Sequence, residues 1–168
     1  LISGPPGRAT QMNQGAMAAT GDILIFLHGD TLLPSDFDWL VRQAVLEPNT
    51  AAGAFELSIT GARRSLRLVE KMVNWRSRYL QMPYGDQGIF LQAKIFEEVG
   101  GFPEMPIMED FELIRKLRKR GRIAILSVAV LTSGRRWQKL GILKTTLINQ
   151  IVIIAYLLGV SPEILAQY

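Results

Sequence analysis

Apolar residues follow two patterns along the chain, and the patterns alternate. Short continuous apolar or alternating runs predict strands, and apolar residues spaced three or four positions apart predict helices. We predict strands over residues 23–27, 52–59, 86–91 and 123–131. We predict helices over residues 8–20, 35–46, 63–80, 94–99 and 109–120. Because strands and helices alternate, the predicted class is α/β, with a mostly parallel sheet flanked by helices.

The last part of the chain, residues 140–168, is predicted to be a helical tail. Its longest apolar stretch, residues 151–160, is shorter than the roughly 20 apolar residues that a membrane-spanning helix needs. We therefore expect the tail helix to pack one face against protein. The residues of that face, spaced by four, three and four, are Leu147, Ile151, Ile154 and Leu158. The alternatives are packing against a second copy of the chain, and a helix lying on a membrane whose anionic lipid attracts the basic helix 63–80.

Composition indicates one globular domain over residues 1–168. Apolar residues make up 48% of the chain and charged residues 20%, which is typical of globular proteins rather than disordered ones. There are no cysteines, which excludes disulfides, thiolate metal sites and a cysteine nucleophile. The net charge of +4 fits an anionic ligand, a nucleic acid or an anionic membrane, and does not choose among them.

The first candidate site follows the predicted strand 23–27, where the chain turns polar at His28-Gly29-Asp30. In a parallel α/β sheet, ligands bind at the carboxyl ends of the strands, which is where these residues would lie. A carboxylate at that position suits a hard divalent cation, which prefers oxygen ligands and can bridge to substrate phosphates. The alternative is that Asp30 only caps the turn that follows it.

Two further motifs carry acidic residues. Glu109, Asp110 and Glu112 begin a predicted helix, where acids are favoured by the helix dipole, yet three acids in four positions are more than a cap needs. One of them is a candidate general base. Asp86 and Gln87 lie between two glycines before a predicted strand.

A basic motif follows the last predicted strand. It consists of Arg135, Arg136 and Trp137, and two arginines beside an aromatic residue form a plausible clamp for a diphosphate. A solvated basic loop is the alternative.

The order of these motifs resembles that of the family 2 glycosyltransferases, which have the GT-A fold. The stretches that carry the resemblance are FLHGDT (26–31), GDQG (85–88), MEDFEL (108–113) and RRW (135–137). Together with GRATQMNQGA (7–16), they are most similar to a bacterial branch labelled arsenosugar-biosynthesis glycosyltransferases. The resemblance covers nearly the whole chain and implies a GT-A-like, Rossmann-like fold. The family's first nucleotide-binding strands have no counterpart here, so we expect an N-terminally incomplete domain.

For the donor side, the resemblance implies that Asp30 binds Mg²⁺ or Mn²⁺ and the sugar diphosphate. His28 replaces the first acid of the family's D-x-D motif, so it either binds the metal or packs. Arg8 and Asn13 correspond to a helix that helps to line the nucleotide pocket. Arg135 and Arg136 would bind the donor diphosphate.

For the acceptor side, the resemblance implies that Asp110, of the Glu109-Asp110 pair, is the general base. Asp86 and Gln87 correspond to a loop near the acceptor. Trp137 belongs to a motif of processive members, but the glutamine of that motif is missing, so a processive synthase is not expected.

The implied activity is inverting transfer of a sugar from a nucleotide-sugar donor to a hydroxyl acceptor, which in some family members is a lipid. The implied cofactor is a divalent metal, no nucleic-acid partner is expected, and the expected location is the cytoplasm, with membrane-peripheral binding as the alternative. Two other functions remain open from the residues alone. They are a nucleotidyltransferase on a similar fold, and a non-catalytic nucleotide-binding or scaffold domain whose acids are only helix caps.

Overall fold

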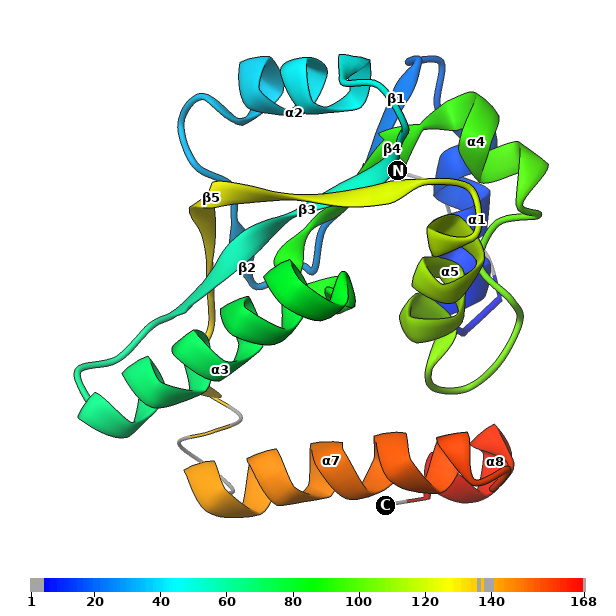
Figure 1. Cartoon of the computed structure of the whole chain (residues 1–168). Coiled ribbons are helices and arrows are strands. Elements are labelled where there is room, and N and C mark those ends of the chain that lie inside the picture. The colour runs from blue at the N-terminus through cyan, green and yellow to red at the C-terminus, as the bar shows by residue number, and fades with distance from the viewer. Residues whose placement is uncertain (1–4, 136, 138–140, 168) are drawn as a thin grey trace.

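A curled five-stranded sheet with helices around it forms the centre of the computed structural model, which describes residues 5–135, 137 and 141–167 (Figure 1). The strands are β1 (Ile23–Phe26), β2 (Thr31–Leu32), β3 (Thr50–Ile59), β4 (Ile89–Gln92) and β5 (Arg122–Thr132). The helices are α1 (Arg8–Ala18), α2 (Phe37–Leu46), α3 (Arg64–Leu80), α4 (Ala93–Glu98), α5 (Glu109–Arg118), α7 (Ile142–Leu157) and α8 (Pro162–Leu165). The predicted elements are all present, with ends shifted by a few residues, and β2 is an additional short strand.

The strands lie in the order β1-β4-β3-β5-β2, and their pairing is mixed. Among the strands that the structure describes, only β3 and β5 pair in parallel, whereas β1–β4, β3–β4 and β2–β5 are antiparallel. The α/β class is confirmed, but the expectation of mostly parallel pairing is wrong. The reason is that β4 inserts between β1 and β3 in the reverse direction, and an apolar run does not encode strand direction.

The reversed direction of β4 brings two motifs together. Phe26, the last residue of β1, is the register partner of Ile89, the first residue of β4. The segment before β4 therefore lies at the same end of the sheet as the segment after β1. Had β4 been parallel to β1, Asp86 would lie at the opposite end from Asp30.

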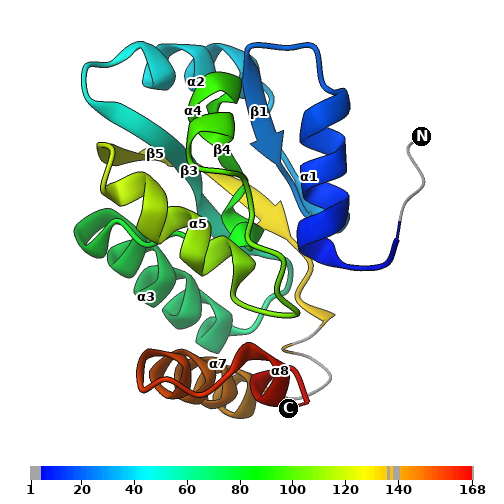
Figure 2. The same ribbon diagram turned by 90° about the vertical axis from the view of Figure 1, so that its right-hand side faces the viewer.

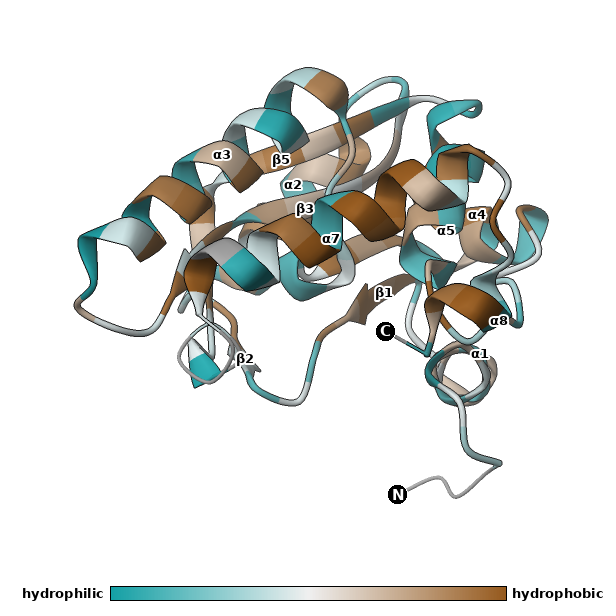
Figure 3. Ribbon diagram, turned by 90° about the horizontal axis from the view of Figure 1, so that it is seen from below, coloured by the Kyte–Doolittle hydropathy of each residue, from teal (hydrophilic) through white to brown (hydrophobic). Residues whose placement is uncertain are grey.

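The helices cover the sheet on more than one side. In Figure 1, α2 lies above the strands, and α3, α7 and α8 lie below them. In the perpendicular view, α1 lies beside β1 at the edge of the sheet, and α5 crosses in front of the strands (Figure 2). Seen from below, α3 and α7 lie next to each other, and α7 is mainly hydrophobic in colour (Figure 3).

The tail helix α7 does not bury the face that the sequence predicts. Leu147, Ile151, Ile154 and Leu158 are between 55% and 80% exposed, so that expectation is wrong. The helix contacts the domain through other residues, including Tyr156, whose hydroxyl donates to Glu112 Oε1 at 2.7 Å. Apolar residues surround most of α7, so their spacing could not identify the inward face. Among the described residues, no helix is long and apolar enough to cross a membrane.

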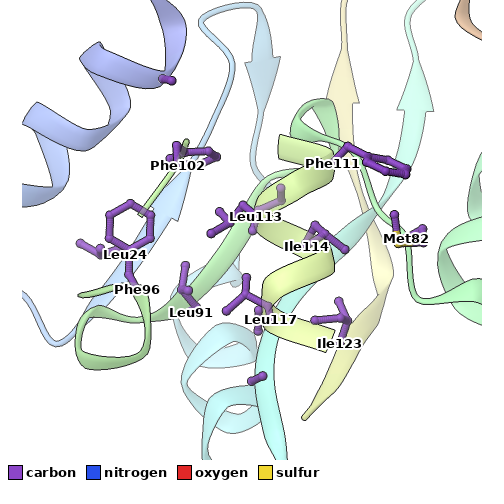
Figure 4. Close-up of a cluster of buried hydrophobic side chains, with 14 of the residues drawn as sticks. Leu24, Met82, Leu91, Phe96, Phe102, Phe111, Leu113, Ile114, Leu117 and Ile123 are labelled. Atoms are coloured by element: carbon purple, nitrogen blue, oxygen red, sulfur yellow. The ribbon is translucent and has the colours of Figure 1, made fainter. Parts of the chain in front are cut away.

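The packing of α5 fixes the site. Leu113, Ile114 and Leu117 are fully buried and pack with Leu91 of β4 and Ile123 of β5 in one hydrophobic cluster (Figure 4). Burying a leucine or isoleucine side chain contributes on the order of 1.5–3 kcal/mol, so these three residues hold the helix in one rotation about its axis. That rotation determines where the acids of its first turn point.

Candidate active site

A pocket of about 320 Å³ lies where β1 and β5 end and β4 begins. Its polar wall comes from segments far apart in the chain: Arg8, His28, Asp30, Tyr84, Asp86, Asp110 and Ser133. Its apolar wall is formed mainly by the tail, through Ile148, Val152 and Ile153 of α7 and Leu165 at the end of α8. The pocket therefore combines several charged groups with an apolar side that the tail supplies.

Asp30 lies at the mouth of the pocket, and its side chain is 42% exposed. Its Oδ2 atom lies 3.4 Å from Nη2 of Arg135, and its backbone oxygen accepts a hydrogen bond from Ser133 N at 3.2 Å. The pairing of β2 with the end of β5 brings these segments together. Asp30 makes no cap to α2, which begins with Asp36 at its N-cap position.

The fit of these residues to a divalent cation depends on how many ligands the ion takes from the protein. Within the described part of the chain, no group of three or more histidine and acidic side chains is arranged to hold a metal. Mg²⁺ bound with a substrate phosphate commonly takes only one or two protein carboxylates, with phosphate oxygens and water as the other ligands. Asp30 by itself supplies the one carboxylate that such a metal needs, so the site fits a metal that binds together with an anionic substrate.

His28 makes a specific contact inside the pocket. Its Nε2 atom lies 2.8 Å from Nη2 of Arg8. An arginine nitrogen can only donate, so Nε2 is the acceptor, and a neutral ring carries its proton on Nδ1. Burial, and then the charge of Arg8, lower the pKa of His28, although Asp110 and Asp30 oppose this. The contact favours packing over metal binding for Nε2.

Arg8 also contacts Glu109, so one guanidinium connects α1 to two site segments. Arg8 Nη1 lies 3.2 Å from Glu109 Oε1, and the carboxylate side chain is only 1% exposed. Burial raises the pKa of Glu109, while a backbone hydrogen bond and Arg8 oppose the rise. Glu109 is not part of the pocket wall, and we interpret it as a group that positions Arg8.

Asp110, the next residue, does line the pocket. Its Oδ2 atom accepts a hydrogen bond from Gly85 N at 2.7 Å, and its Oδ1 atom accepts one from Phe111 N at 2.8 Å. The preceding residue, Met108, has φ of 70°, a left-handed conformation that is uncommon outside glycine. This turn starts α5 with Asp110 beside the loop before β4.

The loop before β4 rests on a buried hydrogen-bond network around Gln87. The Gln87 side chain donates to Phe55 O at 2.9 Å and accepts from Ser77 Oγ at 2.8 Å. It also accepts from Tyr84 N at 3.2 Å. Gln87 is fully buried and does not line the pocket, so it supports the loop from the protein interior.

Asp86 and Tyr84 face the pocket from the same loop. The Arg76 guanidinium lies 3.4 Å from the centre of the Tyr84 ring, a cation–π contact that holds the ring in place. The Oδ1 atom of Asp86 is buried and has no hydrogen-bond partner among the described residues. Burial raises the pKa of Asp86 to about 6, against the opposing charge of Arg76.

The remaining predicted residues divide between the pocket and the framework. Asn13 exchanges two hydrogen bonds with the backbone of Phe102, at 2.9 and 3.0 Å, and does not line the pocket. Trp137 lines the pocket, whereas Arg135 is exposed and contacts Asp30 without lining the pocket itself. Arg136 lies outside the described residues.

Sequence reasoning missed several pocket residues. Tyr84 and Gly85 adjoin the Asp86-Gln87 motif, and their position next to it was the available signal. Ile148, Val152 and Ile153 belong to a tail with no polar motif, so nothing in the sequence marked them as site residues.

Comparisons with known proteins find a match among solved structures and none by sequence. No protein-family model and no curated protein matches the sequence. Among solved structures, the chain is similar to the mannosyltransferase PcManGT from Pyrobaculum calidifontis, determined in complex with GDP-Man and Mn²⁺. The match has 17% sequence identity and a TM-score of 0.50, and it covers 76% of this chain and 36% of that one. The chain thus spans little more than a third of that protein, and at this identity the likeness concerns the fold.

Proposed function

We propose that the chain is an inverting glycosyltransferase domain of the family 2 type, which transfers a sugar from a nucleotide-sugar donor to a hydroxyl acceptor. The observation that carries the proposal is that Asp30 and Asp110, from distant segments, line one pocket at the same end of the sheet. The structural neighbour, which was determined with GDP-Man and Mn²⁺, supports a nucleotide-sugar donor and a divalent metal.

Asp110 is the proposed general base. It would accept the proton of the acceptor hydroxyl while the acceptor oxygen attacks the anomeric carbon and the bond from that carbon to the diphosphate breaks. Attack from the face opposite the leaving group inverts the configuration. The hydrogen bond from Gly85 N holds the carboxylate in place for this transfer.

Asp30 and Arg135 are proposed to bind the donor diphosphate. Arg135 is an exposed cation in contact with Asp30, suited to the negative charge that grows on the leaving group. Asp30 would hold the divalent metal, which supplies further charge stabilisation when bound. Asp86 and Trp137 would contact the acceptor.

The contacts of Asp110 argue against a domain whose acids serve only as helix caps. A capping acid needs contacts only with its own helix, and the Phe111 contact is of that kind. The contact with Gly85, which is 25 residues away, instead ties the carboxylate to a second pocket segment.

The donor side is tested by isothermal titration of GDP and UDP into the protein, with and without Mn²⁺. We expect binding that Mn²⁺ strengthens, and we expect Asp30→Asn to remove the effect of Mn²⁺ while leaving the Tm nearly unchanged. Asp22→Asn is the matched control, because Asp22 is an exposed acid just before β1, at the other end of that strand. Equal Mn²⁺ dependence in Asp30→Asn and wild type would contradict the role of Asp30.

The acceptor side is tested by release of nucleoside diphosphate from a panel of nucleotide sugars with added hydroxyl acceptors. Asp110→Asn should lower the transfer rate by about 10²–10⁴-fold, because that is the usual contribution of a general base, while nucleotide binding persists. Transfer at the wild-type rate would exclude Asp110 as the base.

A further inference from the structure

Helix α7 has apolar residues on two opposite sides, and the domain covers only one of them. The inner side lines the pocket through Ile148, Val152 and Ile153. On the outer side Leu147, Ile151, Ile154, Leu157 and Leu158 are all more than half exposed. A contiguous apolar side of a helix normally packs against protein or lipid, and within the described chain nothing covers the outer side of α7.

Helix α3, next to α7, carries a second exposed apolar stripe. Leu68, Met72, Trp75 and Tyr79 are each more than half exposed, and their spacing of four, three and four places them on one face. The rings of Trp75 and Tyr79 are 5.5 Å apart. Exposed Trp and Tyr side chains are characteristic of membrane–water interfaces, where one end of the ring is apolar and the other is hydrated.

Cations accompany both stripes. Arg64 lies one turn before Leu68, Lys71 lies one turn before Trp75, and Lys144 is in the first turn of α7. None of these three makes an ion pair with a residue that the structure describes. The acid of α3, Glu70, is buried and accepts a hydrogen bond from Ile59 N at 2.5 Å, and α7 contains no acid. The surface is therefore both apolar and cationic.

We propose that the outer sides of α3 and α7, two helices that lie next to each other (Figure 3), bind an anionic membrane, with both helices lying in the interface. The apolar side chains enter the boundary between headgroups and acyl chains, and Arg64, Lys71 and Lys144 contact anionic headgroups. At 16 residues, α7 is roughly 24 Å long, shorter than the ~30 Å hydrocarbon layer, so it lies along the membrane.

A second copy of the chain fits this surface less well than lipid does. A two-fold interface places the same patch of both copies together. It would enclose the cations of both copies, and neither helix supplies an exposed acid to pair with them. Anionic headgroups provide that missing charge.

Sedimentation with vesicles tests the proposal, using phosphatidylcholine alone and phosphatidylcholine with 30% phosphatidylglycerol. We expect the protein to pellet with the anionic vesicles, to remain in the supernatant with neutral ones, and to bind less as salt increases. Ile151→Gln with Leu158→Gln, both at exposed positions, should weaken binding about tenfold or more. Arg64→Gln with Lys71→Gln should also weaken it by about tenfold or more.

Helix α2 provides the matched control. Arg42→Gln with Leu46→Gln removes one exposed cation and one exposed apolar side chain from the far side of the sheet, and this variant should bind vesicles like wild type.

The proposal is overturned if the protein does not bind anionic vesicles, if it binds neutral vesicles equally well, or if the α2 control weakens binding as much as the α7 variant. A dimer in analytical ultracentrifugation that the α7 variant dissociates, without vesicle binding, would assign the surface to a second copy. Asp110→Asn should still bind vesicles, so a failed membrane test and a failed glycosyltransferase test remain distinct.

Discussion

Replacing Arg8 with methionine should destabilise the fold through a residue 101 positions away (109 − 8). Arg8 is the cation beside the buried Glu109 carboxylate, at 3.2 Å. Methionine keeps much of the length of the side chain and removes the charge. Glu109 would then be left as a buried, unpaired carboxylate, which is far more costly than an exposed one.

The magnitude follows from the exposure of the two partners. Removing one member of a fully buried ion pair costs about 3–5 kcal/mol. Glu109 is buried, but the side chain of Arg8 is 53% exposed, so water already screens part of the interaction. We therefore expect a loss of about 1–3 kcal/mol at pH 7. For a chain of this size that corresponds to a fall in Tm of roughly 3–10 °C.

Thermal unfolding followed by circular dichroism measures the effect, with Arg120→Met as the control. Arg120 and Glu98 are 3.0 Å apart, a similar geometry, but both side chains are about half exposed. The control should cost at most about 0.5 kcal/mol. Adding Glu109→Gln to Arg8→Met should recover most of the loss, because the uncompensated charge is gone.

The pH dependence provides an independent check. The folded-state pKa of Glu109 lies above its ordinary value of 4.5, and losing Arg8 raises it further. The folded state then binds more protons than the unfolded state above pH 4.5, so the stability of Arg8→Met should fall as the pH rises from there. If Arg8→Met and Arg120→Met cost the same, or if Glu109→Gln restores nothing, the buried pair does not stabilise the fold as argued.

Three other predictions concern the loop before β4. In Gly85→Ala the new Cβ would lie 3.0 Å from Asp110 Oδ2, so the rate of sugar transfer should fall by about 10²-fold while the protein still folds. Gly15→Ala is the control, because no atom lies within 4 Å of the new Cβ, and it should not lower the rate. Gln87→Ala should lower the free energy of unfolding by about 2–4 kcal/mol in urea titrations, because several buried groups lose their hydrogen-bond partner. A loss below about 0.5 kcal/mol would show that the hydrogen bonds of Gln87 do not stabilise the loop. Because the pKa of Asp86 is raised to about 6 from 3.8, the free energy of unfolding of the wild type should fall as the pH rises from about 4 to 6. Asp86→Asn should reduce this fall by up to about 3 kcal/mol. Identical pH profiles of stability for the variant and the wild type would contradict the raised pKa.

The sequence allowed the positions of Asp30 and Asp110 at one end of the sheet to be predicted, because polar residues directly follow or precede well-marked elements. It could not distinguish Glu109 from Asp110. Glu109 lies one turn before Leu113 and Asp110 one turn before Ile114, and both apolar residues are fully buried. Helical spacing therefore directs both carboxylates inward. Only the tertiary neighbours, Arg8 for one and the pocket for the other, give them different surroundings.

Two other features depend on information that a local pattern does not carry. The direction of β4 is set by how the chain returns from α3, so the antiparallel pairing that brings Asp86 to the pocket was not predictable from an apolar run. The orientation of α7 depends on tertiary contacts, among them the hydrogen bond from Tyr156 to Glu112 of α5 and the packing of Val152 and Ile153 against the core. With apolar residues around most of the helix, the sequence alone supported several rotations equally well.

The long separations among the pocket residues have a consequence for the order of folding. The Arg8–Glu109 contact closes a loop of about a hundred residues, and the contact between Asp30 and Arg135 closes one of 105. Closing such loops costs chain entropy that local helices do not repay, and the β2–β5 pairing closes a loop of the same length, so the pocket contacts and the complete sheet depend on each other. The pocket then exists only in the completely folded chain. Any molecule that binds there binds no earlier intermediate, so at saturating concentration it slows global unfolding and protects even the distant amides of β3 from hydrogen exchange.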